Sequence, residues 1–334
     1  MNDNELDDLA AEVVRRVLRA TRGGGRAPGG GGGPAAGVGS AGGAARPVVR
    51  GSARPLEDIS WRGPQVQLSA WTPAAGPRRV ADFVDHTLLK AEATRADILK
   101  LCAEAREHRF AAVCVNPVWV ELCAAELSGT DVAVASVCGF PLGAATPEVK
   151  AAEAADAVAR GAAEVDMVAA IGHIKGGEWR HVEDDIRAVV EACRRRGDAG
   201  GALVKVIIES AVLAPEDIVK ASAVARLAGA HFVKTSTGFH PKGGATVEAV
   251  RLMRLTVGDD LGVKAAGGIR DCAAALAMIG AGASRLGTSS GVSFVSCLGP
   301  APLKLAELLR QPDAHAASCR SGGCAVPPAG GQTY

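Results

Sequence analysis

Aromatic residues are scarce in this sequence of 334 residues, which contains only 4 Trp, 6 Phe and 1 Tyr. Hydrophobic residues nevertheless make up 48% of the chain, so its core has to be built mainly from small aliphatic side chains such as Ala and Val. This composition favours alanine-rich helices packed against buried strands.

The sequence also lacks an excess of charge of either sign, because its formal net charge is +1. Without a global basic field we expect neither nucleic acid nor an anionic membrane surface as a partner. No apolar run approaches the roughly 20 residues that cross a bilayer, and the chain opens without an apolar signal region. We therefore expect a cytoplasmic protein.

Paired cysteine motifs are missing as well. The chain has 9 cysteines, an odd number, with no CxxC pair and no Cys/His cluster at metal-ligand spacing. We expect free thiols in a reducing compartment and no metal site. Cys114 and Cys138 are expected to be small buried residues rather than nucleophiles, and Cys319 and Cys324 fall in a Gly/Pro-rich tail.

The N-terminal part of the chain differs from the rest in its composition and hydrophobic pattern. Residues 4–21 place apolar side chains at helical spacing, with acidic residues at the start and arginines at the end, which predicts an amphipathic helix in residues 1–22. Between residues 23 and 43, 12 of 21 residues are glycine. We predict a flexible linker with an irregular segment over 23–78, one large domain over 79–311 and a flexible tail over 312–334.

Short apolar runs alternate with alanine-rich helical patterns through the large domain. The runs are FVDHT (83–87), AAVCV (111–115), VAVASV (132–137), EVDMV (164–168), VKVIIE (204–209), HFVKTS (231–236), GVKAA (262–266) and SRLGT (284–288). Continuous rather than alternating apolar character is typical of parallel strands buried on both faces. Eight strand–helix units in about 230 residues predict an α/β fold of the (β/α)₈ TIM-barrel type. An open doubly wound sheet is the alternative, although no GxGxxG follows the first strand.

Three lysines lie inside these apolar strands, at Lys205, Lys234 and Lys264. A buried amine beside a second cation loses its proton more easily, and can then attack a carbonyl carbon to form a Schiff base. The other interpretation is that each lysine belongs to a structural ion pair.

Two acids accompany the lysines at positions that we expect at the carboxyl ends of strands. Asp166 is a candidate for proton transfer in Schiff-base chemistry. Asp85 could either transfer a proton or orient a lysine by hydrogen bonding.

A phosphate site is predicted after the last two strands, where this type of barrel commonly binds phosphate. Gly267 and Gly268 follow the seventh strand, and Ser289 and Ser290 follow the eighth.

Seven of these segments resemble deoxyribose-phosphate aldolases. They are VDHTLL (84–89), AAVCVNP (111–117), EVDMV (164–168), KVIIES (205–210), FVKTSTGF (232–239), KAAGGIR (264–270) and LGTSSG (286–291), within a resemblance that runs from about residue 80 to about residue 309. The resemblance implies a class I aldolase that interconverts 2-deoxy-D-ribose 5-phosphate with glyceraldehyde 3-phosphate and acetaldehyde, without a metal or other cofactor.

The resemblance also implies residue roles. Lys234 forms the Schiff base, Lys264 lowers the pKa of Lys234, and Asp166 moves protons with a water. Lys205 and Asp85 have supporting roles. The phosphate is held by Gly238, Gly267, Gly268, Ser289 and Ser290.

The two ends of the chain suggest roles beyond the barrel. Some members of this family end in a tyrosine that helps to move a proton, and Tyr334 is the last residue here; an ordinary disordered terminus is the alternative. The N-terminal helix resembles the encapsulation peptides that bind shell proteins of bacterial microcompartments. The alternatives are a self-associating coiled-coil segment or a helix folded back on the barrel.

Other functions remain open at this point. The chain could be a Schiff-base aldolase for another phosphorylated aldehyde, or a catalytically inactive barrel that serves as a scaffold or cargo adaptor. A homodimer is expected because dimers are the commonest assemblies of soluble enzymes.

Overall fold

The computed structural model of the protein describes residues 3–22, 78–194, 201–301 and 303. Residues 23–77 of the predicted 23–78 linker lie outside the described residues, as does the predicted tail with Cys319, Cys324 and Tyr334.

The centre of the structure is a closed barrel in which every strand pairs in parallel with the next and β8 pairs with β1. Its strands are β1 (Val84–Leu88), β2 (Ala112–Val115), β3 (Ala133–Cys138), β4 (Glu164–Val168), β5 (Leu203–Ile207), β6 (Phe232–Lys234), β7 (Gly262–Ala266) and β8 (Arg285–Thr288). All eight predicted strands are present, and the expected TIM barrel is confirmed.

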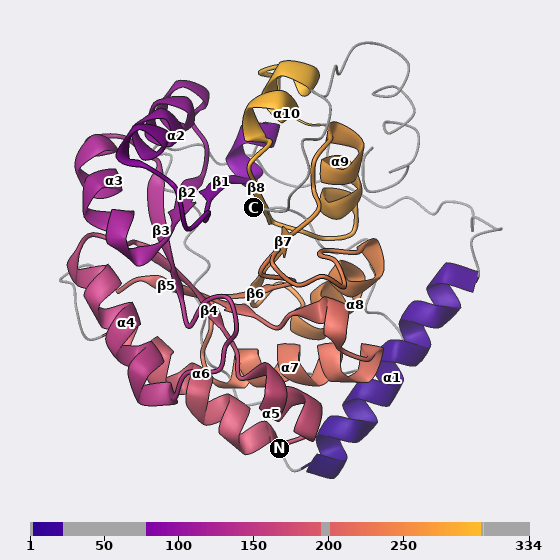
Figure 1. The fold of residues 1–334 in the computed structure, drawn as a ribbon. Coiled ribbons are helices and arrows are strands. Elements are labelled where there is room, and N and C mark those ends of the chain that lie inside the picture. The colour runs from indigo at the N-terminus through magenta and orange to yellow at the C-terminus, as the bar shows by residue number, and fades with distance from the viewer. Residues whose placement is uncertain (1–2, 23–77, 195–200, 302, 304–334) are drawn as a thin grey trace, which may run out of the picture.

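Helices surround the barrel (Figure 1). They are α2 (Arg95–His108), α3 (Val120–Glu126), α4 (Pro147–Ala159), α5 (Ile171–Gly176), α6 (Trp179–Arg194), α7 (Pro215–Leu227), α8 (Val247–Val257), α9 (Cys272–Gly280) and α10 (Gly291–Leu298), with short 3₁₀ turns η3 (Val80–Phe83), η4 (Pro117–Trp119) and η5 (Ser210–Val212). Strands buried on both faces explain why the strand segments are continuous apolar runs.

Local sequence signals set several helix starts. Pro147 and Pro215 occupy the first turns of α4 and α7, where a missing N–H group costs little. Thr94, Thr246 and Asp271 accept a hydrogen bond from a backbone N–H of the first turn of α2, α8 and α9. These caps fix the ends of the strand-to-helix loops that carry the polar residues described below.

The predicted N-terminal helix is α1 (Asp3–Arg22), and it packs against α7 and α8 (Figure 1). Leu6, Ala10 and Val13 on its apolar side are buried, and Asp7 forms an ion pair with Lys220 of α7. This is the folded-back arrangement, one of the three possibilities for this helix. Binding to a shell stays a prediction, and it would require the same apolar side.

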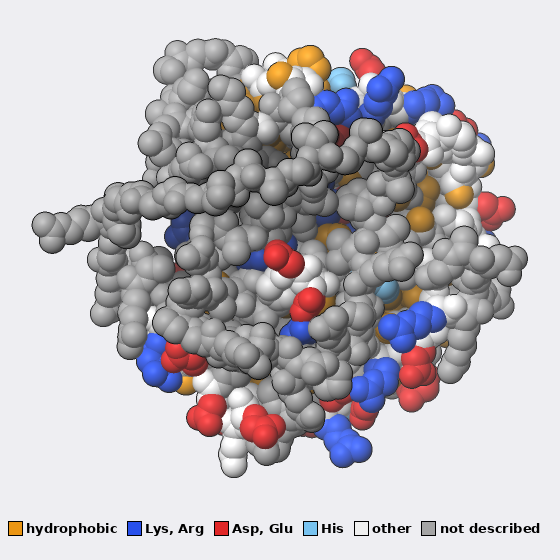
Figure 2. All heavy atoms as spheres, turned by 180° about the vertical axis from the view of Figure 1, so that it is seen from behind, with side chains coloured by type: hydrophobic (Ala, Val, Ile, Leu, Met, Phe, Trp, Pro, Cys, Tyr) orange, Lys and Arg blue, Asp and Glu red, His pale blue; other side chains and the backbone are white. Residues whose placement is uncertain are grey.

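Acidic and basic side chains lie side by side around the visible periphery of the described surface (Figure 2). Within the described parts of the chain, no helix combines the length and the apolar character that a membrane span requires.

Candidate active site

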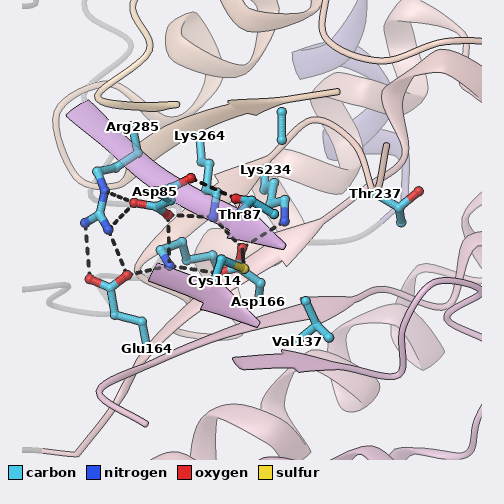
Figure 3. Close-up of polar contacts among 12 residues, drawn as sticks. Asp85, Thr87, Cys114, Val137, Glu164, Asp166, Lys234, Thr237, Lys264 and Arg285 are labelled. Carbon is cyan, nitrogen blue, oxygen red and sulfur yellow. Dashed lines mark hydrogen bonds and ion pairs between the residues drawn. The ribbon is translucent and has the colours of Figure 1, made fainter. Parts of the chain in front are cut away.

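Three adjacent strands bring the three lysines together inside the barrel. Lys205 lies in β5, Lys234 in β6 and Lys264 in β7, and Lys234 is directly opposite Lys264 in the pairing of β6 with β7. All three side chains are buried, and Lys234 is the last residue of its strand. In Figure 3, Lys234 lies on the side toward which the strand arrows point, so its amine is at the carboxyl-terminal mouth of the barrel.

Asp166 of β4 is the common partner of the three lysines. Its Oδ2 atom accepts hydrogen bonds from Nζ of Lys234 at 2.8 Å and of Lys264 at 2.6 Å. Its Oδ1 atom accepts a hydrogen bond from Nζ of Lys205 at 2.7 Å. One carboxylate therefore holds the amines of Lys234 and Lys264 beside each other, as the predicted chemistry requires.

The position of the acids along their strands corrects one expectation. Asp85 is the second residue of β1, and Asp166, Lys205 and Lys264 are each the third residue of a five-residue strand, so none of them lies at a strand end. Charged side chains are tolerated at this depth because they are paired with one another. Only Lys234 occupies the predicted terminal position.

A second layer of charge lies deeper in the barrel, away from the mouth (Figure 3). Arg285 of β8 donates hydrogen bonds to Asp85 at 2.6 Å and to Glu164 at 2.9 Å and 3.1 Å. Asp85 also contacts Lys264 at 2.5 Å, and Glu164 contacts Lys205 at 2.7 Å. Asp85 is fully buried among these cations, which favours the orienting role over direct proton transfer.

Glu164 and Arg285 were not among the site residues predicted from the sequence. A signal existed for Glu164, because residues two apart in a strand face the same side, so it had to share the barrel interior with Asp166. Arg285 is 121 residues away from Glu164 along the chain, and only the closure of the barrel shows that they meet.

Direct contacts join seven charged groups, of which all but the partly buried Arg285 are buried, into one network. The carboxylates are Asp85, Glu164 and Asp166, and the cations are Lys205, Lys234, Lys264 and Arg285. Three negative and four positive charges leave a net charge of +1 when every group is ionised. The network is neutral only if one cation loses its proton, and an uncompensated charge in a buried site is costly.

The shifts in pKa identify which cation that is. Burial lowers the pKa of the Lys234 ammonium, and the positive charge of Lys264 lowers it further, so that Asp166 does not restore the ordinary value. Burial acts on Lys264 in the same direction, but the carboxylates of Asp166 and Asp85 outweigh it and raise the pKa of Lys264. For Lys205, Asp166 and Glu164 likewise overcome burial and raise the pKa.

The carboxylates of the network are held in their ionised form. Burial opposes ionisation of Asp166, yet Lys205, Lys234 and Lys264 together lower its pKa well below the ordinary value. Burial also opposes ionisation of Asp85, whose pKa is lowered by Arg285 and the lysines. Lys234 is thus the cation of this network that loses its proton most readily, and Asp166 is ionised beside it.

The structure brings together the glycines predicted to bind phosphate. Gly238, Gly267 and Gly268 all have positive φ angles, of 87°, 87° and 79°, which side chains other than glycine rarely adopt. A Cβ atom on Gly267 would lie 3.4 Å from Cα of Gly238, so the two backbones are close. Gly244, which the sequence analysis missed, packs its backbone on Gly267 and leaves no room for a side chain.

Ser289 and Ser290 lie at the start of α10. Ser290 is the N-cap residue, but its side chain makes no capping hydrogen bond, unlike Thr94, Thr246 and Asp271 at other helices. Thr288 donates a hydrogen bond to the carbonyl of Ile269, which ties this segment to the loop after β7. The first turn of α10 therefore offers uncapped N–H groups near the glycine loop, an arrangement suited to an anion.

Cys114 and Cys138 are buried with raised pKa values, caused first by burial, as expected for residues that are not nucleophiles. Among the described residues no cluster of His, Cys, Asp and Glu has the composition and spacing to hold a metal ion. Tyr334 lies outside the described residues, so its role in proton transfer stays a prediction.

The barrel places a lysine of lowered pKa at a strand end, hydrogen-bonded to a carboxylate and beside a second ammonium. This arrangement is typical of an enzyme that forms a Schiff base. A model of the DeoC/LacD family of aldolases matches residues 79–294. The chain belongs to this family, and the predicted class of enzyme, a carbon–carbon lyase, is confirmed.

Two relatives match this chain over almost their whole length. The chain is 58% identical over 216 residues to a deoxyribose-phosphate aldolase of Geobacillus sp., which covers 65% of this chain and 94% of the relative. It is 56% identical over 214 residues to a deoxyribose-phosphate aldolase of Enterococcus faecalis, which covers 64% of this chain and 94% of the relative.

Solved structures agree with the fold. A structure described as a putative deoxyribose-phosphate aldolase from Coccidioides immitis is 40% identical with a TM-score of 0.62, covering 66% of this chain and 87% of that chain. A tetrameric deoxyribose phosphate aldolase from Aeropyrum pernix is 34% identical with a TM-score of 0.60, covering 66% of this chain and 91% of that chain.

Proposed function

We propose that this chain cleaves 2-deoxy-D-ribose 5-phosphate reversibly into D-glyceraldehyde 3-phosphate and acetaldehyde through a Schiff base on Lys234. The observation that carries the proposal is the asymmetry among the three lysines. Lys234 alone combines a lowered pKa with a position at the mouth of the barrel, whereas the pKa values of Lys205 and Lys264 are raised.

The reaction begins with attack of the neutral Lys234 amine on the aldehyde carbon of the sugar, followed by loss of water to form an iminium ion. Removal of the proton from the hydroxyl group on C3 then breaks the C2–C3 bond. The bonding electrons pass to the iminium ion, which becomes a neutral enamine, and glyceraldehyde 3-phosphate leaves. Protonation of the enamine and addition of water release acetaldehyde and regenerate the amine.

The charge network favours the bond-breaking step. The iminium ion again gives the network a net charge of +1, and it becomes a neutral enamine when it accepts the electrons of the C2–C3 bond. Asp166, whose Oδ2 atom is 2.8 Å from Nζ of Lys234, stabilises the positive charge of the iminium ion. We assign the movement of protons to Asp166 acting with a water molecule, and the supporting roles to Lys205 and Asp85, which hold Asp166 and Lys264 in place.

We assign the phosphate group of the substrate to Gly238, Gly267 and Gly268 with Ser289 and Ser290. The support for this assignment is the proximity of the glycine backbones and the uncapped first turn of α10. The same residues would bind any phosphorylated aldehyde, so substrate assays distinguish deoxyribose 5-phosphate from other sugar phosphates.

The test combines turnover with trapping of the covalent intermediate. Borohydride reduction in the presence of deoxyribose 5-phosphate should fix a single adduct on Lys234, located by peptide mass spectrometry. Lys234→Met should lose at least about ten-thousandfold in kcat, whereas Lys100→Met, at an exposed lysine of α2, should retain full activity. An inactive scaffold would give no adduct, and an aldolase for another substrate would give an adduct without turnover of deoxyribose 5-phosphate.

We propose α1 as the part of the chain that binds a partner protein, with a microcompartment shell as the expected partner. Because the apolar side of α1 packs on α7 and α8, the helix has to leave the barrel before it can bind elsewhere. Deleting residues 1–45 should leave turnover intact and abolish copurification with shell proteins. Copurification that survives the deletion would contradict this role, and the dimeric state remains a prediction to be tested by light scattering.

A further inference from the structure

Two phenylalanine rings meet across the mouth of the barrel. Phe140 lies in the loop after β3 and Phe239 in the loop after β6, and their ring centroids are 5.2 Å apart in an edge-to-face arrangement. Strands β4 and β5 lie between β3 and β6 in the barrel, so this contact spans the carboxyl ends of the strands that carry Asp166 and Lys205. The sequence has few aromatic residues, and two of its 6 phenylalanines form this pair.

Phe140 forms the outer layer of an apolar wall of the active site. Its side chain packs on a small cluster composed of Leu89, Cys114, Ala135 and Val137. The thiol of Cys114 in this cluster lies 3.9 Å from Oδ2 of Asp166, the atom that holds Lys234. The ring of Phe140 is therefore one layer of side chains away from the reacting amine.

Phe239 is held on the other side of the mouth, five residues after Lys234. Its backbone N–H donates a hydrogen bond to the hydroxyl oxygen of Thr237 at 3.1 Å. The Thr237 hydroxyl in turn donates to the buried carboxylate of Glu209 at 2.5 Å, and Figure 3 shows Thr237 on the same side of the charged network as Lys234. The backbone of Phe239 is thus anchored while its side chain remains 39% exposed.

We propose that Phe140 and Phe239 form a gate that closes the mouth of the barrel over Lys234 and restricts access of water to the Schiff base. This inference rests on the proposed function. An edge-to-face ring contact is weak enough to open for substrate and re-form over it. Water that enters too early would hydrolyse the iminium ion or protonate the enamine before the acceptor aldehyde reacts, so a closed gate favours carbon–carbon bond formation.

The gate also maintains the dry surroundings of Lys234. Burial is the largest cause of the lowered pKa of Lys234, so hydration of the open site should raise that pKa and move the acid limb of the activity profile to higher pH. A ring pair with a purely structural role would leave this limb in place.

The experiment uses the full-length protein with acetaldehyde in D₂O, with and without glyceraldehyde 3-phosphate. Enamine formed on Lys234 either takes deuterium from solvent, which labels the methyl group of acetaldehyde, or adds to glyceraldehyde 3-phosphate. Phe239→Ala should increase the ratio of deuterium exchange to aldol addition about tenfold and move the acid limb to higher pH. Leu142→Ala is the matched control, because Leu142 is 74% exposed in the same loop as Phe140.

Phe140→Ala and the double variant complete the test. If the rings act as a pair, the double variant should change the exchange ratio no more than either single variant. If Phe239→Ala behaves like Leu142→Ala in both the exchange ratio and the pH profile, the proposed gate is refuted. This result holds even if Phe140→Ala does not fold. Wild-type protein that exchanges no deuterium into acetaldehyde would instead contradict the proposed function.

Discussion

At the scale of single residues, Lys264 illustrates how a side chain that does not react can control one that does. Its ammonium shares Oδ2 of Asp166 with Lys234, and its raised pKa keeps it charged when Lys234 is neutral. The two lysines have the same chemistry and face each other across adjacent strands. Their difference arises because Lys264 contacts two carboxylates and Lys234 contacts one.

Replacing Lys264 by Met should raise the pKa of Lys234, because the network loses one positive charge and keeps its three carboxylates. We expect kcat/KM at neutral pH to fall at least about a hundredfold and the acid limb of the pH profile to move to higher pH. The profile is measured with deoxyribose 5-phosphate over a pH series. An unshifted acid limb in Lys264→Met would show that Lys264 does not act through the charge of Lys234.

Arg285 lies on the side of the network away from Lys234 and binds two carboxylates at once. Removing it as Arg285→Met leaves Asp85 and Glu164 buried with one cation fewer, which should lower the free energy of unfolding by about 3–5 kcal/mol. Urea unfolding measures this loss. The double variant Arg285→Met/Glu164→Gln should recover part of the stability, and a double variant no more stable than the single one would refute the pairing.

The sequence predicted part of this residue-level picture. The three buried lysines and Asp166 were recognised as reactive groups, but their roles were assigned by resemblance to a family. Nothing in the sequence ranked Lys234 above Lys264, because the ranking depends on which carboxylate oxygens each ammonium reaches across the closed barrel.

At the scale of elements, the strands were predictable and the partner of α1 was not. Continuous apolar runs identified all eight strands because a parallel barrel buries both faces of each strand. The expectation that the charged residues lie at the carboxyl ends of their strands was wrong, since most of them lie in the middle. The amphipathic pattern predicted α1, but an apolar stripe does not specify the surface that covers it.

The packing of α1 on α7 and α8 can be tested by one substitution. Val13→Asp would place a charge in the buried contact and should release α1, since burial of a valine contributes about 1.5–3 kcal/mol. Faster hydrogen exchange in α1 and along the covered side of α7, with unchanged aldolase turnover, is the expected result. Asp8→Asn, at an exposed position of α1, is the control, and equal exchange in both variants would show that the helix is not held by this contact.

At the scale of the whole molecule, the buried network should make stability depend on pH in two opposite ranges. The pKa values of Asp85, Glu164 and Asp166 are lowered in the folded protein, so their contribution is complete above about pH 4 and is lost as the pH falls further. The pKa of Lys234 is lowered as well. Between this lowered pKa and about pH 10, the Lys234 amine is therefore protonated in the unfolded chain but not in the folded protein. That site therefore stabilises the fold progressively as the pH rises toward 10.

Urea unfolding across this pH range separates the two effects. Between neutral pH and about pH 10, the free energy of unfolding of the wild type should rise relative to that of Lys234→Met. Below about pH 4 both proteins should lose stability, because both keep the three carboxylates. Parallel curves for the two proteins above neutral pH would contradict a lowered pKa of Lys234.

The most direct test of the account is a titration of the lysine amines by NMR of protein labelled with ¹⁵N at Nζ, with Lys234 assigned from its missing signal in Lys234→Met. We expect Lys234 to lose its proton below the ordinary lysine value of about 10.4, while Lys205 and Lys264 remain charged above it. A Lys234 amine that titrates at or above the ordinary value, or a Lys264 amine that titrates first, would contradict the central claim.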